Sequence, residues 1–125
     1  MRKILALMLA MLLVLSMTTA ALADEKDWEI VVVPKDATNP WFVRMDTGVK
    51  EYAAETGLNI YQQVTPEIDA TLQYQLIQDL IAAGVDAICV VPVDPGSLEP
   101  VLKQARDAGI IVIAHEGASL ENVDY

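Results

Sequence analysis

The chain has one cysteine and one histidine among its 125 residues. A single cysteine excludes an intrachain disulfide, and Cys89 lies in an apolar run at residues 87–91, so we expect it to be buried as a small hydrophobic side chain. A metal site at His115 would need further His, Cys or carboxylate ligands at suitable spacing. Because His115 is the only histidine in the chain, we expect no metal. No cysteine lies at the junction after Ala23, so a lipid anchor on the mature N-terminus would have no attachment point.

Basic residues are also scarce. Eight Lys and Arg face 18 Asp and Glu, which gives a formal net charge of −10. This balance disfavours nucleic acid and anionic membranes as partners and suits a freely diffusing protein, which we expect to be a monomer. Common active-site motifs are missing as well, because the sequence has no G-x-S-x-G, P-loop or G-x-G-x-x-G pattern. We therefore expect no enzymatic activity and no cofactor.

The first 23 residues have the three parts of a secretory signal peptide. Arg2 and Lys3 form a positive region, residues 4–15 are apolar, and residues 21–23 form an A-x-A cleavage site. The sequence thus predicts a periplasmic or extracellular protein after cleavage near Ala23. An uncleaved membrane anchor is the alternative, because residues 4–23 carry no charge and reach the roughly 20 residues that span a bilayer.

Residues 24–125 have the length of one small domain, and glycines divide them into repeated units. Gly57, Gly84 and Gly109 each end a helical pattern and precede an apolar stretch, which is typical of left-handed residues that close helices. Their spacing fits one helix and one strand per unit. The predicted strands are residues 30–33, 58–64, 87–91 and 110–114, and the predicted helices begin at Pro40, near Asp69 and near Ser97.

The strand sequences predict a doubly wound parallel sheet. Three strands are nearly continuous runs of apolar residues, as in strands covered on both faces, whereas residues 58–64 are mixed and belong at an edge. Right-handed crossovers then give a three-layer α/β fold with strand order 2-1-3-4. In the third helix, Pro100 is expected to lie in the first turn, where proline is tolerated. The buried stripe predicted for the first helix comprises Phe42, Met45, Val49, Tyr52 and Ala53.

Candidate ligand-binding residues follow the strands, because open α/β sheets bind ligands at the carboxyl ends of their strands. Asn39 is a good N-cap for the first helix, whose free backbone N–H groups could bind an oxygen-rich ligand. Trp41 either faces a ligand cleft at the carboxyl ends of the strands, where its ring could cover the apolar face of a sugar, or packs in the core. Phe42 falls on the predicted buried stripe, yet it also lies in the first turn beside the cleft.

Charged side chains follow three of the strands. Lys35 and Glu116 are either solvated surface charges or hydrogen-bonding partners of a polar ligand, and we favour the second interpretation because of their position. Asp94 is first of all an N-cap and only secondly a candidate ligand contact. Another possible function is that of an exported enzyme in which Glu116 and His115 act as an acid–base pair, but no further residues in the sequence support an active site of this kind. The candidate site therefore comprises Lys35, Asn39, Trp41, Phe42, Asp94 and Glu116, with no catalytic or metal-binding residue.

Two long stretches resemble the N-terminal lobe of type 1 periplasmic sugar-binding proteins, the solute receptors of ABC importers. They are VVVPKDATNPWFVRMDTGVKEYAAETG and LQYQLIQDLIAAGVDAICVVPVDPGSLEPVLKQARDAGIIVIAHE. In that family Asn39, Trp41 and Phe42 match the ligand-facing start of the first helix. Lys35 resembles the lysine that reaches the ligand in autoinducer-2 and rhamnose receptors. Glu116 stands where an aspartate usually accepts sugar hydroxyls, so the resemblance does not fix the sugar.

The resemblance implies a solute-binding protein that holds a sugar or an autoinducer-2-like furanose between two lobes and delivers it to ABC permease subunits. The alternative is a ligand-presenting input protein for a membrane signalling receptor. Permease and ATPase genes beside this one would favour import, and a sensor kinase gene would favour signalling. Residues 24–125 correspond to about four βα units of the first lobe, so we expect an incomplete lobe that binds sugar weakly or not at all alone.

Overall fold

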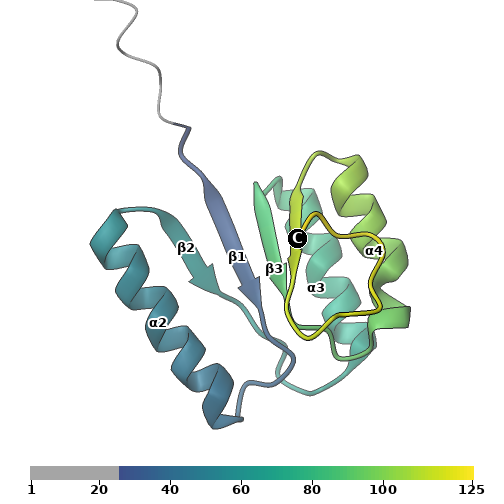
Figure 1. Cartoon of the computed structure of the whole chain (residues 1–125), viewed down its shortest axis with the longest axis horizontal. Coiled ribbons are helices and arrows are strands. Elements are labelled where there is room, and N and C mark those ends of the chain that lie inside the picture. The colour runs from purple at the N-terminus through teal and green to yellow at the C-terminus, as the bar shows by residue number, and fades with distance from the viewer. Residues whose placement is uncertain (1–25) are drawn as a thin grey trace, which may run out of the picture.

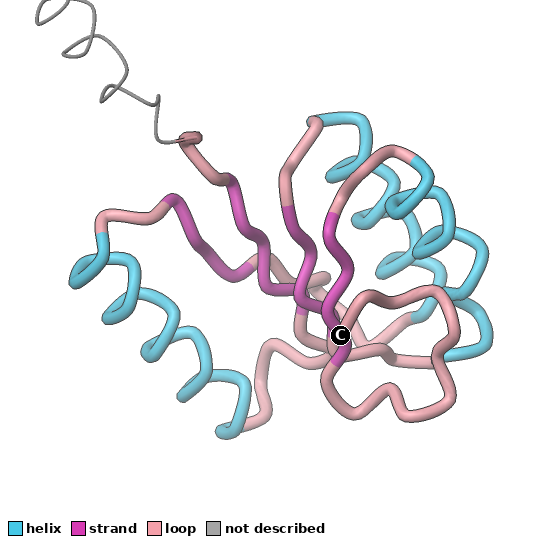
Figure 2. Tube along the Cα trace, turned by 45° about the horizontal axis from the view of Figure 1, so that its top comes forward, coloured by secondary structure: helices cyan, strands magenta, loops and turns pink. Residues whose placement is uncertain are grey.

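The computed structural model describes residues 26–125, and both the predicted signal peptide and its alternative as a membrane anchor lie outside this range. Strands and helices alternate in the order β1 (Glu29–Val33), α2 (Pro40–Thr56), β2 (Asn59–Gln62), α3 (Ala70–Ala83), β3 (Ala87–Val90), α4 (Pro95–Asp107) and β4 (Ile111–Ala114). The strands are parallel and lie in the order β2-β1-β3-β4. The sheet lies between α2 on one face and α3 and α4 on the other (Figures 1 and 2). The predicted three-layer fold and its strand order are thus confirmed.

The predicted helix-closing glycines adopt the left-handed conformation. Gly57, Gly84 and Gly109 have φ angles of 75°, 78° and 83°. The amide of Gly84 donates to the carbonyls of Leu80 and Ile81, which would otherwise be unsatisfied at the end of α3. Each glycine therefore ends its helix at the point where the next strand must begin.

Alanine substitutions at two glycines are expected to change stability in opposite directions. Gly84→Ala places a Cβ at a positive φ and should lower the free energy of unfolding by about 1 kcal/mol or more. Gly48→Ala lies inside α2, where a Cβ meets no atom within 4 Å, and should raise it by about 0.5–1 kcal/mol. Urea unfolding of both variants measures the two changes in the free energy of unfolding. Equal changes would contradict the left-handed conformation of Gly84 at the end of α3.

The start of α4 differs from the prediction. The helix begins at Pro95 with Asp94 as its N-cap, two residues before the predicted start at Ser97. An aspartate cap followed by proline at the first helical position is a strong start signal, and it overrides the serine further along. Pro100 consequently lies in the second turn rather than the first, where its missing N–H removes one bond of the helix.

The two faces of the sheet are covered unequally. Toward α3 and α4, the side chains of the strands pack in one continuous core, in which Val31, Ile88 and Val112 have no exposed surface. On the opposite face, α2 packs alone, against β2, so Ile113 of β4 is 36% exposed. The prediction that β4 is covered on both faces is therefore wrong for residues 26–125.

The predicted stripe of α2 is buried at one end only. Phe42 is buried, Met45 and Val49 are half-buried, and Tyr52 is 51% exposed. A helix that has no helical neighbour on its face of the sheet contacts other elements along a narrow line, so only part of its apolar stripe is covered. None of the helices in residues 26–125 combines the length and the apolar character that a membrane crossing requires.

Candidate functional site

The candidate site lies where β1 and β3, which are neighbours in the sheet, send the chain to opposite faces. After β1 the chain passes to α2, and after β3 it passes to α4 on the other side (Figure 1). In open α/β sheets, ligands usually bind where neighbouring strands diverge in this way, at their carboxyl ends, and we refer to this place as the crevice. The loop at residues 34–39, the loop at residues 91–94 and the loop after β4 border this crevice.

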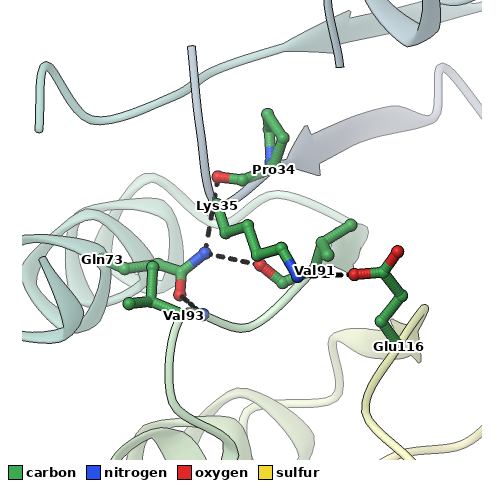
Figure 3. A network of polar contacts seen from close by, with 6 residues as sticks. All are labelled: Pro34, Lys35, Gln73, Val91, Val93 and Glu116. Atoms are coloured by element: carbon green, nitrogen blue, oxygen red, sulfur yellow. Dashed lines mark hydrogen bonds and ion pairs between the residues drawn. The ribbon is translucent and has the colours of Figure 1, made fainter. Parts of the chain in front are cut away.

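Lys35 and Glu116 meet at this edge of the sheet. The ammonium Nζ of Lys35, two residues after β1, lies 2.6 Å from Oε2 of Glu116, two residues after β4 (Figure 3). Because β3 separates these strands, the pair crosses the carboxyl end of the strand between them. Both side chains remain more than a third exposed, so the pair contributes little to stability and both groups are accessible to a ligand. The sequence predicted both residues, and the structure brings them into contact.

Glu116 has an unusual backbone conformation and a perturbed pKa. Its φ is 60°, the one positive value at a residue other than glycine within residues 26–125. Such a conformation costs on the order of 1–2 kcal/mol for an L residue and is concentrated at functional sites. The hydrogen bond from Lys35 is the largest cause that lowers the pKa of Glu116 below its ordinary value of 4.5, and the charges of Lys35 and His115 add to the effect. The carboxylate is therefore charged at neutral pH.

The loop that carries Glu116 is fixed at its far end by α4. The Glu99 carboxylate accepts hydrogen bonds from the amide of Glu121 at 2.5 Å and from the amide of Asn122 at 3.2 Å. A hydrogen bond from the Asn122 side chain is the largest cause that lowers the pKa of Glu99, and the two amide bonds add to the effect. Leu120 is buried in the core between these contacts and Glu116. The loop thus holds Glu116 against the end of the sheet.

The other border of the crevice is the N-terminus of α2. As predicted, Asn39 caps this helix, and its Oδ1 accepts the amide of Trp41 at 2.9 Å. Asp36 orders the preceding turn, because one of its oxygens accepts the amide of Thr38 at 2.7 Å and the amide of Asn39 at 3.2 Å. The bond from the Thr38 amide is the largest cause that lowers the pKa of Asp36. Sequence reasoning missed this role, although an aspartate two residues before a threonine is a typical turn signal.

Trp41 and Phe42 point to different environments. Trp41 is 61% exposed on the first turn of α2, at the same end of the sheet as Lys35 and Glu116. Phe42 is only 2% exposed, so the structure uses its ring in the interior rather than as an open ligand surface. Lys35 Nζ lies 6.0 Å from the centroid of that ring, at the outer limit of a cation–π contact. Of the two predicted rings, Trp41 alone is presented to solvent.

Asp94 serves mainly as a helix cap. Its carboxylate accepts the amide of Gly96 at 3.2 Å and also the hydroxyl of Ser97. The side chain is exposed at the carboxyl end of β3, so it borders the crevice. Its carboxylate oxygens are already engaged in the cap, and a ligand contact would share them.

Two hollows of the surface suggest different sites. One of about 400 Å³ is bordered by Glu116, Gly117, Leu120 and Tyr125. A larger one, of about 570 Å³, lies at the amino end of β4 between the end of α4 and the last residues. It opens at the end of the sheet opposite Lys35, and its cations Lys103 and Arg106 already form ion pairs. We therefore place the candidate site at the carboxyl end, where Lys35 and Glu116 are in contact and Trp41 is exposed at the same end of the sheet.

Among residues 26–125, no group of three or more His, Cys, Asp or Glu side chains is arranged to hold a metal ion. Cys89 was expected to be buried but is only half-buried, because its side chain on β3 faces the α2 side of the sheet, and the partial burial raises the pKa of its thiol.

Replacement of Lys35 by methionine is expected to raise the pKa of Glu116 toward its ordinary value, because the main cause of its lowering is removed. The sign for stability follows from the lowered pKa. The pair stabilises the fold fully at pH values above the ordinary pKa of 4.5, and this stabilisation is lost as the pH falls through the lowered pKa of Glu116. Carbon-13 NMR titration of the Glu116 carboxyl measures the shift. Lys50→Met, which removes an ion pair on α2, is the control, and an unchanged Glu116 pKa in Lys35→Met would refute the contact.

Comparison with known proteins agrees with the fold. A family described as a periplasmic binding protein domain matches residues 30–125. The D-ribose/D-allose-binding protein of Pseudomonas aeruginosa is 34% identical over 87 residues, which are 67% of this chain and 27% of that protein. The chain therefore spans less than a third of the length of that relative.

Solved structures of solute-binding proteins also resemble this chain in sequence and fold. LsrB from Clostridium saccharobutylicum, in complex with AI-2, has a TM-score of 0.66 and 27% identity, and the match covers 69% of this chain and 26% of LsrB. A solute-binding protein of an ABC transporter from Burkholderia graminis, in complex with D-arabinose, has a TM-score of 0.62 and 34% identity, over 74% and 32% of the two chains. Because the two identities are 27% and 34%, the similarity is one of sequence as well as of fold.

Proposed function

Because this chain belongs to the periplasmic binding protein family, we propose that it forms one wall of a sugar-binding site in a solute-binding protein of an ABC importer. The parallel sheet and its strand order fit the N-terminal lobe of the type 1 fold, as the sequence resemblance indicated. In this proposal the protein works in the periplasm after export, and its partners are the sugar and the permease subunits. It performs no reaction, and its relatives are described as binding proteins.

The observation that carries the proposal is the Lys35–Glu116 pair across the carboxyl end of the sheet. A carboxylate can accept hydrogen bonds from two neighbouring sugar hydroxyls, and an ammonium group can donate to hydroxyl or ring oxygens. Trp41 provides an exposed flat ring at the same end, suited to the apolar face of a sugar. Anion, cation and ring together match the chemistry of a pentose or hexose.

In the proposed mechanism, the sugar hydroxyls replace the direct contact between Lys35 and Glu116. The two side chains hold each other in place before the ligand binds, so binding costs little side-chain conformational entropy. A second lobe would then close over the exposed side of the sugar, in a hinge motion common to ligand-closing proteins. The binding energy therefore depends on contacts from both walls.

The chain alone is expected to bind D-ribose with a dissociation constant in the millimolar range or weaker, on the order of 4 kcal/mol of binding energy. The reason is exposure. Small-molecule sites typically bury about 70–90% of the ligand surface, whereas Lys35, Trp41 and Glu116 form one open wall. Isothermal titration calorimetry of the purified chain tests this expectation, and a micromolar constant would show that one wall suffices.

A further inference from the structure

Gln73 is a polar residue with no exposed surface, in the first turn of α3. It lies on the same buried stripe as Leu76 and Ile77, where an apolar residue would be expected. A buried amide destabilises the fold unless its donors and acceptor are satisfied. The reason for a glutamine at this position must therefore lie in its hydrogen bonds.

The carboxamide of Gln73 bonds to the backbone of two separate segments (Figure 3). Its Nε2 donates to the carbonyl of Val91 at 2.9 Å and makes a longer contact of 3.5 Å with the carbonyl of Pro34. Its Oε1 accepts the amide of Val93 at 2.8 Å. One side chain thus connects the segment after β1 with the segment after β3.

These bonds begin where the strand pairing ends. The register between β1 and β3 extends to Val33 and Val90, and the amide of Val91 still donates to the carbonyl of Val33 at 2.9 Å. Beyond that bond the two segments diverge toward α2 and α4 on opposite faces. Gln73, which comes from α3, bridges them at the point of divergence.

Two of the three bridged groups precede a candidate ligand-binding residue by one position. Pro34 comes directly before Lys35, and Val93 comes directly before Asp94. We propose that Gln73 is the positioning residue of the crevice: its amide sets the separation of the two loops, so that Lys35 reaches across the end of β3 to Glu116. The inference rests on the proposed function only in that the crevice is the ligand site.

The chemistry of the amide explains the choice of residue. A neutral carboxamide is both donor and acceptor, as two carbonyls and one N–H require. Methionine at this position would have a similar shape but would leave the Val93 amide unsatisfied. A carboxylate would face two carbonyl oxygens without a proton to donate.

The test compares Gln73→Met with Leu102→Ala in the purified chain. Leu102 is fully buried on α4, so its truncation weakens the core without removing a hydrogen bond of the crevice. The first readout is the pKa of Glu116 by carbon-13 NMR, and the second is hydrogen exchange of the Val93 amide. We expect Gln73→Met to produce most of the rise in the Glu116 pKa that Lys35→Met produces, with faster exchange at Val93. Leu102→Ala should leave the Glu116 pKa at its original value.

A folded Gln73→Met chain with an unchanged Glu116 pKa would overturn the inference, as would an equal rise in Leu102→Ala. If Gln73→Met does not fold, Gln73→Asn provides the same comparison, because its amide is one methylene shorter and cannot keep all three contacts. A rise in the Glu116 pKa is then again expected, and its absence overturns the inference. No sugar is present in this test, so its failure would leave the proposed function intact, and a failure of sugar binding would leave this result unaffected.

Discussion

Replacement of Glu116 by alanine is expected to weaken D-ribose binding by at least about tenfold in a two-lobed protein. Hydrogen bonds to a charged group contribute about 1.5–3 kcal/mol each, so loss of the carboxylate that accepts the sugar hydroxyls should exceed a factor of ten. A suitable protein is a chimera in which this chain replaces the matching part of the D-ribose/D-allose-binding protein of Pseudomonas aeruginosa. Calorimetry with D-ribose measures the affinity.

The matched control for Glu116 is Glu55→Ala. Glu55 is an exposed acid near the end of α2, distant from the crevice, and its removal changes the net charge by the same amount. If both variants bind D-ribose as tightly as the parent chimera, Glu116 does not touch the sugar. Equal losses in both would mean that net charge, and not the position of the carboxylate, governs the affinity.

Trp41→Ala is expected to weaken binding in the same chimera by at least about tenfold, since a ring that covers a sugar face contributes both buried apolar area and aromatic contact. Stability should change little, because the ring is mostly exposed. Tyr52→Ala is the control, as it removes another exposed aromatic from the same helix, away from its N-terminus. A loss of affinity confined to Trp41→Ala supports the placement of the ring, and unchanged affinity would remove Trp41 from the site.

Local sequence signals predicted the frame of this fold correctly. Glycines at Gly57, Gly84 and Gly109 marked the helix ends because a positive φ is costly for other residues. The polar character of β2 placed it at the edge, and right-handed connections then fixed the strand order. Membership of the periplasmic binding protein family, indicated by the long motifs, is confirmed as well.

The features that sequence reasoning missed depend on contacts between distant segments. The exposure of Tyr52 and Ile113 follows from the absence of a second helix beside α2 in residues 26–125, which the pattern of α2 itself does not reveal. The bridging role of Gln73 depends on where β1 and β3 end relative to α3. A polar residue on an apolar helical stripe was the available signal, and it became interpretable once its partners were known.

The candidate site was predictable as a set of residues but not as a geometry. Parallel strands bring their carboxyl ends to one edge, and this rule placed Lys35 and Glu116 together. This rule does not separate Phe42 from Trp41, because both lie within the first turn of α2. The helical periodicity did predict the burial of Phe42, but it left the exposure of Trp41 open. The positive φ of Glu116 likewise had no signal in the sequence.

Chemical-shift mapping of the purified chain with D-ribose, at concentrations on the order of 100 mM, tests the central claim most directly, since such concentrations populate millimolar complexes. The account predicts that the largest changes occur at Lys35, the Trp41 indole and Glu116, at the carboxyl end of the sheet. Changes confined to the opposite end, around Lys103, Gly109 and Ile110, would contradict it.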